Sequence, residues 1–332
     1  MSPKLSVIIT SFNEGVNLDR LFHDLSKQDF DKNAYEILFL EAGNDSKKRA
    51  LEKLGDSCVL LKYWHIPKLS RTAALNFLVK ESAGDLIVRL DARTHIESDY
   101  LSRIYALSLR ENVANVGGVQ IPVGRSDEQR IIASIMLHPV GMGGAKYRSV
   151  SYKGEVDSVY LGAFCRKQMP NEPWFDEELP KISEDSDLNL RIRKSGGKVH
   201  LDSSIAVWHY PRESLKPFFK LCFNYGFGRA LFVMKNKQFS APRQIILPFL
   251  AIFGLFFYTL GFAFPVAHTI LAYAFLFYMA AILFISFRNQ LGDLRRGLLT
   301  FFGFSGCHFF WTLGFFCGLI DYLFLRLKKL FL

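Results

Sequence analysis

Charged side chains stand directly after two short apolar runs in the first hundred residues. Glu41 follows Phe39-Leu40, and Asp91 follows Val88-Arg89-Leu90. A carboxylate at a strand end can accept hydrogen bonds from a base or a ribose, or hold a divalent ion beside a diphosphate. Arg71 precedes the second run and could face phosphate oxygens. For each residue alone, a helix cap or a turn is the commoner interpretation, so only their joint pattern indicates a nucleotide site.

The elements that must position these residues alternate between short apolar strands and amphipathic helices. Strands are predicted at residues 7–9, 37–40, 59–63 and 86–90. Helices are predicted between them from the spacing of apolar residues, as for Leu18, Leu21, Phe22 and Leu25. This alternation predicts parallel βαβ units, in which ligands bind beyond the carboxyl ends of the strands. The sequence thus predicts an α/β fold whose site is formed by residues 11–14, 41–46 and 91–93.

The pattern is mixed after residue 123. Residues 155–164 and 198–207 are predicted to be extended, and residues 184–194 to be a helix. Ser183, Glu184 and Asp185 precede that helix. Taken alone, these three residues are typical of a cap that complements the dipole of the helix.

Three long apolar stretches fill the C-terminal region, at residues 245–264, 266–287 and 298–320. A helix of about 20 apolar residues spans the hydrocarbon core of a bilayer. Buried helices of a soluble protein are the alternative, but three such stretches in a row are hard to cover in a chain of this size. We therefore expect residues 241–332 to be membrane-associated helices that follow an α/β domain at residues 1–240.

The topology of this tail has two interpretations. With the first domain in the cytoplasm, the first two stretches form a hairpin and the basic segment 288–296 returns to the cytoplasm, as the positive-inside rule expects. A third complete span would carry Arg326, Lys328 and Lys329 to the outside, against that rule. The alternative is a re-entrant or interfacial pair that is broken near Gly314.

The composition limits the classes of partner that the chain is expected to bind. The net charge is +10, but the basic residues form no long run and recur beside the apolar stretches, which favours a membrane surface over nucleic acid. Residues 215–234, with several lysines and phenylalanines, could form a surface-lying amphipathic segment. The five cysteines include no CxxC, so neither a disulfide framework nor a zinc site is expected. The first residues carry no secretion signal, and we expect the N-terminal domain to stay in the cytoplasm.

Five segments of the chain resemble family 2 glycosyltransferases, in the order expected of that family and over about residues 4–235. They are LSVIITSFNE, EILFLEAGNDS, SRTAALN, DLIVRLDAR and ISEDSDLNLRIRKSGGKV. The resemblance implies the GT-A fold, a Rossmann-like sheet that holds a nucleotide diphosphate sugar. Within the family, the chain is most similar to the bacterial succinoglycan-type glucosyltransferases, which also carry a short membrane tail. This similarity implies an inverting hexosyltransferase that uses a UDP-sugar and a lipid-linked saccharide acceptor at the cytoplasmic face of the inner membrane.

The resemblance also implies which residues bind the donor. Thr10, Phe12 and Glu14 would line the nucleoside pocket, with Phe12 under the uracil. Glu41 stands where the family has the first Asp of a stretch that reads the uracil. The diphosphate would be contacted by Arg71 and by a second, more distant arginine, Arg229.

Asp91-Ala92-Arg93 occupies the Asp-x-Asp position, where the family places a metal ligand at the third residue. A guanidinium cannot ligate a cation. Either Asp91 holds manganese or magnesium with another group, or Arg93 itself neutralises part of the diphosphate charge. His95 and His209 are candidate replacement ligands, and His209 is preferred because the family places a diphosphate-side histidine near it. A divalent cation is therefore expected, with Asp91 and His209 as its ligands.

The Glu184-Asp185 pair resembles the acidic pair of the family. Asp185 would be the general base that takes a proton from the acceptor hydroxyl, with Glu184 beside it. A positioned carboxylate typically contributes about 10²–10⁴-fold to a rate. The processive motif Gln-x-x-Arg-Trp is absent near residues 225–229, so transfer of one sugar per encounter is expected.

Two rival functions stay open. A polyprenyl-phosphate sugar synthase would form product from the lipid phosphate without a saccharide primer. A non-catalytic membrane scaffold with a degenerate glycosyltransferase fold would tolerate Asp185→Asn and hydrolyse no UDP-sugar.

Overall fold

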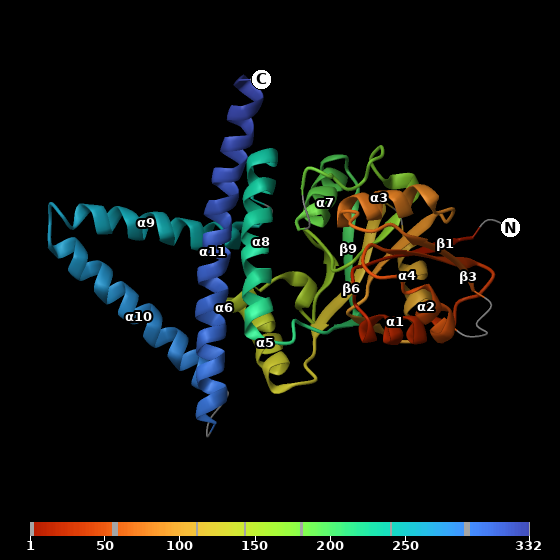
Figure 1. Cartoon of the computed structure of the whole chain (residues 1–332), viewed down its shortest axis with the longest axis horizontal. Coiled ribbons are helices and arrows are strands. Elements are labelled where there is room, and N and C mark those ends of the chain that lie inside the picture. The colour runs from red at the N-terminus through yellow and green to blue at the C-terminus, as the bar shows by residue number, and fades with distance from the viewer. Residues whose placement is uncertain are drawn as a thin grey trace. The chain divides into compact units, whose positions relative to one another are not determined.

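The computed structural model describes residues 3–54, 59–110, 112–142, 144–179, 182–239, 241–288 and 293–331, with side chains up to residue 324 (Figure 1). The chain forms two compact units. The first combines Met1–Pro122 with Ala145–Tyr210, and the second combines Val123–Gly144 with Pro211–Leu332. These units do not coincide with the predicted functional domains at 1–240 and 241–332, whose boundary stays a prediction.

The first unit is built on a mixed sheet that has nine strands in the described residues. The strand order is β3-β2-β1-β4-β8-β6-β9-β5, and β7 pairs with β9. The strands are β1 (Leu5–Ser11), β2 (Tyr35–Glu41), β3 (Leu60–His65), β4 (Leu86–Asp91), β5 (Thr94–Ile96), β6 (Val113–Pro122), β7 (Lys153–Glu155), β8 (Ala163–Cys165) and β9 (Lys198–His209). Because β1 is parallel to both β2 and β4, and β2 is parallel to β3, these four strands end at the same edge.

Helices cover both faces of this sheet. They are α1 (Val16–Ser26), α2 (Lys47–Leu54), α3 (Arg71–Glu81), α4 (Tyr100–Ser108) and α7 (Glu184–Lys194), with short turns η1 (Lys146–Arg148) and η2 (Arg166–Gln168). The helices α1, α2 and α4 pack into one hydrophobic core, and α3 and α7 pack into the other. The predicted face of α1 is confirmed, since Leu18, Leu21, Phe22 and Leu25 are fully buried.

The first four predicted strands and the helix at 184–194 are confirmed, but the strand predicted at residues 155–164 is wrong. β7 ends at Glu155 and β8 begins only at Ala163. Between them the backbone turns through positive φ at Leu161 (66°) and Gly162 (91°), which a strand does not allow. The apolar residues of this segment are buried by the turn rather than by strand pairing.

The second unit is helical in its described residues. Its elements are α5 (Asp127–Leu137), α6 (Pro139–Met142), α8 (Leu215–Asn236), η3 (Pro242–Ile245), α9 (Ile246–Leu260), α10 (Val266–Arg288) and α11 (Leu294–Phe331). Three segments are long and apolar enough to cross a membrane, Pro242–Leu260, Val266–Arg288 and Leu294–Phe324. These apolar helices support membrane association of the chain.

The helices α8 and α11 run side by side through glycine contacts (Figure 1). A methyl group on Gly314 would overlap the carbonyl oxygen of Phe223, and one on Gly226 would overlap that of Trp311. Small residues allow helix backbones to approach this closely. The break considered near Gly314 is therefore wrong, because α11 continues through this glycine, which serves helix packing.

Candidate active site

The carboxyl ends of β1, β2 and β4 bring the predicted donor residues to one edge of the sheet. Thr10 is in register with Asp91, and Ser11 with Glu41. Phe12 follows on the loop after β1, and its side chain is 64% exposed. An exposed aromatic ring at this edge offers a flat apolar surface on which a base can stack.

Glu41 joins the loops that follow β1 and β2. Its Oε1 accepts hydrogen bonds from the backbone N–H groups of Asn13 (3.2 Å) and Gly43 (2.8 Å), and its Oε2 accepts one from Ser46 Oγ (3.0 Å). The Glu41 side chain is buried. Its first effect is therefore to fix the loop that presents Phe12, and the predicted contact with uracil remains a prediction.

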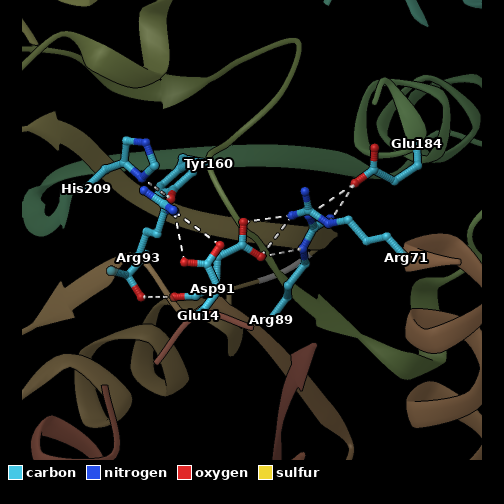
Figure 2. A network of polar contacts seen from close by, with 9 residues as sticks. Glu14, Arg71, Arg89, Asp91, Arg93, Tyr160, Glu184 and His209 are labelled. Atoms are coloured by element: carbon cyan, nitrogen blue, oxygen red, sulfur yellow. Dashed lines mark hydrogen bonds and ion pairs between the residues drawn. The ribbon is translucent and has the colours of Figure 1, made fainter. Parts of the chain in front are cut away.

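Two guanidinium groups and two carboxylates form a network at the end of β4 (Figure 2). Arg71 Nη2 donates to both oxygens of Asp91, at 2.9 and 2.7 Å. Arg89 Nη2 donates to Glu184 Oε1 at 3.1 Å. Two longer contacts cross-link these pairs, Arg71 Nε to Glu184 Oε1 at 3.8 Å and Arg89 Nε to Asp91 Oδ1 at 3.6 Å. The strand end and the first turn of α7 are thus held together by charge.

The environment moves the pKa values of the two carboxyl groups in opposite directions. Burial raises the pKa of Asp91, but the guanidinium groups of Arg71 and Arg89 outweigh it and lower that pKa to about 2. The same carboxylates raise the pKa of Arg71. Burial raises the pKa of Glu184, and repulsion from Asp185 adds to this effect. The attraction of Arg89 and Arg71 lowers the pKa but does not offset the rise. Asp91 therefore stays ionised above about pH 4, whereas the pKa of Glu184 lies above its ordinary value.

Arg89 is the functional candidate that sequence reasoning missed. Its side chain is only 5% exposed. In the described part of the chain, its Nε and Nη1 make no hydrogen bond. A charged residue inside the otherwise apolar run Leu86–Leu90 was the available signal, since arginine is rarely buried without a partner.

Arg93 and His209 each have a neighbour in this site. Arg93 Nε lies 3.0 Å from Glu14 Oε2, so these two predicted donor residues form an ion pair. The hydroxyl of Tyr160 and His209 Nδ1 share a hydrogen bond of 2.9 Å. Thr94 is in register with His209 across β5 and β9, which brings this histidine to the same end of the sheet as Asp91 (Figure 2).

Asp185 opens α7 beside the network. It is half-buried and accepts hydrogen bonds from the N–H (2.7 Å) and Oγ (3.5 Å) of Ser186. Among the described residues it forms no ion pair, so no cationic side chain of that part of the chain occupies its carboxylate. The capping alternative receives no support from Ser183, whose φ is 80° and whose Oγ makes no hydrogen bond to α7, a helix that is described throughout.

A left-handed conformation is uncommon for a residue other than glycine, and such strain gathers at functional sites. Ser183 holds that conformation directly before Glu184 and Asp185. The turn therefore sets the direction in which the two acids enter α7.

Two further predicted residues have partners outside the charged network. His95 Nδ1, on β5, is 2.8 Å from Asp24 Oδ2, and its ring packs near that of Trp208, so this nitrogen already has a carboxylate partner. Arg229 lies on α8 in the second unit, where its guanidinium stands over the ring of Phe232. Its predicted contact with the diphosphate remains a prediction.

The donor set at Asp91 does not fit a divalent cation in this arrangement. Both Asp91 oxygens accept from Arg71, and the third position of the motif is the cation Arg93. Within the described ranges, no three His, Cys, Asp or Glu side chains gather where they could hold a metal ion. A metal bound by Asp91 and His209 would first require Arg71 to move away from Asp91.

A mixed α/β sheet with an acidic and basic cluster at its strand ends is typical of the GT-A class, and known structures agree. A mannosyltransferase from Pyrobaculum calidifontis, in complex with GDP-Man and Mn²⁺, matches with a TM-score of 0.57 and 13% identity over 97% of this chain and 88% of its own. The S. aureus protein TarS matches with a TM-score of 0.50 and 16% identity over 75% of this chain and 42% of its own. The fold is therefore GT-A-like.

The sequence comparisons give the family. Residues 6–167 match the model of glycosyl transferase family 2, and the chain thus carries a glycosyltransferase domain of family 2. The succinoglycan biosynthesis protein ExoA of Rhizobium meliloti is 24% identical over 72% of this chain and 73% of its own. A dolichyl N-acetyl-alpha-D-glucosaminyl phosphate 3-beta-D-2,3-diacetamido-2,3-dideoxy-beta-D-glucuronosyltransferase of Methanococcus voltae is 26% identical over 70% of this chain and 74% of its own.

Proposed function

We propose that this chain transfers one hexose from a UDP-sugar to a lipid-linked saccharide, with inversion at the anomeric carbon. The observation that carries the proposal is the position of Asp185. This carboxylate is free of ion pairs among the described residues and opens α7 next to Glu184, which joins the charged network at the end of β4. A base therefore stands beside the strand edge where donors bind in such folds.

The reaction follows from these positions. Asp185 removes the proton of an acceptor hydroxyl, and the oxygen attacks C1 of the sugar from the face opposite the diphosphate. The C1–O bond to the diphosphate breaks, and UDP leaves with the electron pair. The developing charge on UDP is stabilised by guanidinium groups at this edge, Arg71 and Arg93.

The uridine part of the proposal is supported by the two loops after β1 and β2. Glu41 fixes both loops through backbone N–H groups, and the ring of Phe12 stays exposed beside them. A stacking ring with a preformed loop is a low-entropy platform for a base. Thr10 and Glu14 flank the same loop, and Glu14 keeps Arg93 in place.

The acceptor and the location are supported by the relatives and by the tail. One relative is named for succinoglycan biosynthesis, and the other for transfer to a dolichyl phosphate-linked sugar. Three apolar helices would bring the site to a membrane. We place the catalytic part on the cytoplasmic side of the inner membrane, because the basic segment after the second apolar helix then also faces the cytoplasm.

The test is release of UDP by the detergent-purified full chain with a panel of UDP-sugars, with and without added membrane lipid extract. The proposal expects UDP release that depends on one UDP-hexose and on a saccharide-bearing lipid. Product formed from polyprenyl phosphate alone would instead indicate a polyprenyl-phosphate sugar synthase. No UDP release with any donor or extract would contradict the proposal and favour a non-catalytic scaffold. Manganese is varied in parallel because the Pyrobaculum mannosyltransferase is described with Mn²⁺.

A further inference from the structure

The described part of α11 presents an apolar stripe to its surroundings. Most of its exposed large side chains recur at alternating intervals of four and seven residues, which places them on one side of the helix. They are Leu298, Phe302, Phe309, Leu313, Ile320 and Phe324. Other positions of α11, such as Phe304, Cys307, Gly314 and Phe315, are buried inside the unit. Neighbouring helices cover much of the rest of the described helix, so a bilayer can contact α11 mainly along this one side, as it contacts a helix that lies in its surface.

The α9–α10 hairpin has a different pattern. Exposed apolar residues occur as consecutive pairs along α9, at Phe249-Leu250, Ile252-Phe253 and Leu255-Phe256. On α10, the run from Phe275 to Phe277 is exposed in the same way. Because consecutive residues point in different directions around a helix, this hairpin is apolar all round, as expected for helices surrounded by lipid.

The two kinds of helix run in different directions within the second unit (Figure 1). The helix α9 begins beside α11 and runs away from it, and α10 returns to the first turns of α11, so that α11 lies along the open end of the hairpin. The return is fixed by a hydrogen bond of 2.8 Å between Tyr278 Oη and His308 Nδ1. If the hairpin crosses a bilayer, α11 therefore runs along the bilayer surface.

The position of α8 gives an independent reason to expect α11 at the bilayer surface. It runs in the same direction as α11, with Phe219 against Gly306 and Phe227 against Gly318, both inside the apolar stretch. The exposed residues of its first turns include Lys216 and Lys220. If α11 spanned the membrane, α8 would be carried into the hydrocarbon, where a lysine on an exposed helix face is strongly unfavourable.

The short helix α6 gives a third reason to expect α11 at the bilayer surface. The backbone carbonyl of Val140 shares a hydrogen bond of 2.6 Å with His308 Nε2, which lies in the middle of the apolar stretch of α11. Pro139 and Val140 are exposed. A helix of only four residues cannot pair its backbone groups internally, and such groups are not tolerated in hydrocarbon, whereas they are tolerated at the interface.

We infer that only the α9–α10 hairpin crosses the membrane, and that the α8–α11 pair lies along the cytoplasmic surface of an anionic bilayer. The stripe of α11 enters the boundary between headgroups and acyl chains. Lys216 and Lys220 on α8, with Arg295 at the start of α11, supply positive charge that attracts anionic headgroups. This inference rests on the proposed membrane attachment and not on the proposed reaction.

The test places single cysteines at three exposed positions of the full chain, Arg295→Cys, Asp321→Cys and Phe264→Cys. Each variant is labelled with a membrane-impermeant maleimide in intact cells and in inverted inner-membrane vesicles. A position is scored as reactive when its labelling exceeds that of the unsubstituted chain. Positions 295 and 321 lie towards opposite ends of the apolar stretch of α11, and position 264 lies at the tip of the hairpin.

The inference expects Arg295→Cys and Asp321→Cys to react in inverted vesicles only, and Phe264→Cys in intact cells only. Reaction of Asp321→Cys from the same side as Phe264→Cys would show that α11 spans the membrane and would overturn the inference. Reaction of all three from one side would show that the hairpin does not cross, which would overturn it as well. None of these results depends on enzymatic activity, so failure of the proposed reaction remains distinguishable.

Discussion

Arg89 and Glu184 form an ion pair inside the first unit, with 3.1 Å between Nη2 and Oε1 and side chains that are 5% and 4% exposed. This contact joins the end of β4, where the donor is proposed to bind, to the first turn of α7, which carries the proposed base. Removing one partner of a buried pair leaves the other charge uncompensated, which destabilises a protein by about 3–5 kcal/mol.

Arg89→Met should therefore lower the free energy of unfolding by about 3–5 kcal/mol at pH 8. The loss should be smaller at pH 5, because the raised pKa of Glu184 lets this group become neutral when its partner is absent. Thermal unfolding in detergent at the two pH values measures both effects. The double variant Arg89→Met, Glu184→Leu should recover most of the loss, and an Arg89→Met variant as stable as the parent would contradict the role of the pair.

The lowered pKa of Asp91 should make the stability of the fold depend on pH. Its pKa in the folded protein is about 2, below the ordinary 3.8, so its ionised form stabilises the fold above about pH 4 and this stabilisation is lost as the pH falls towards 2. The shift corresponds to about 2 kcal/mol. Asp91→Asn should flatten the dependence of the unfolding temperature on pH between 4 and 2. An unchanged slope would show that Asp91 does not form this pair in solution.

Arg93 predicts how the chain responds to manganese. Arg93→Asp replaces a cation with a carboxylate, which is an oxygen ligand for a divalent ion. Arg93→Asp should bind Mn²⁺ more tightly than the parent. Binding is measured as the decrease of the electron paramagnetic resonance signal of unbound Mn²⁺. Arg93→Ala is the control, since it removes the charge but adds no ligand. Equal affinity in the two variants would show that position 93 does not face a cation site.

Gly314 predicts the stability of the α8–α11 pair. Gly314→Ala places a methyl group against the carbonyl of Phe223, and such overpacking costs about 1–3 kcal/mol. Gly254→Ala on α9 is the matched control, because its methyl group would meet only Leu271 Cδ1 at 3.9 Å. Gly314→Ala should lower the unfolding temperature in detergent, whereas Gly254→Ala should not. A similar temperature for both variants would contradict the close packing of the two helices.

The strands and helices that position the site could be predicted where local patterns decide the structure. The face of α1 and the helix α7 follow from the spacing of apolar residues, and β1, β2 and β4 from short apolar runs that end in polar residues. The segment at 155–164 could not be predicted in this way. Its apolar residues are buried by a turn through Leu161 and Gly162, whose positive φ values depend on tertiary contacts.

The site was predictable as a set of positions but not as a set of contacts. The strand ends place Glu41 and Asp91 at one edge, as the parallel order requires. That Arg71 covers both Asp91 oxygens, and that Arg93 pairs with Glu14, depends on side chains brought together from distant parts of the sequence. Such contacts leave no periodic signal, and they decide whether Asp91 can bind a metal.

The role of Asp185 is tested most directly by turnover of Asp185→Asn beside Asp29→Asn in the UDP-release assay. Both variants replace one carboxylate with an amide, but Asp29 is exposed and lies outside the site. We expect Asp185→Asn to lose about 10²–10⁴-fold in turnover and Asp29→Asn to keep the parental rate. Parental turnover by Asp185→Asn would contradict the assignment of Asp185 as the base that activates the acceptor.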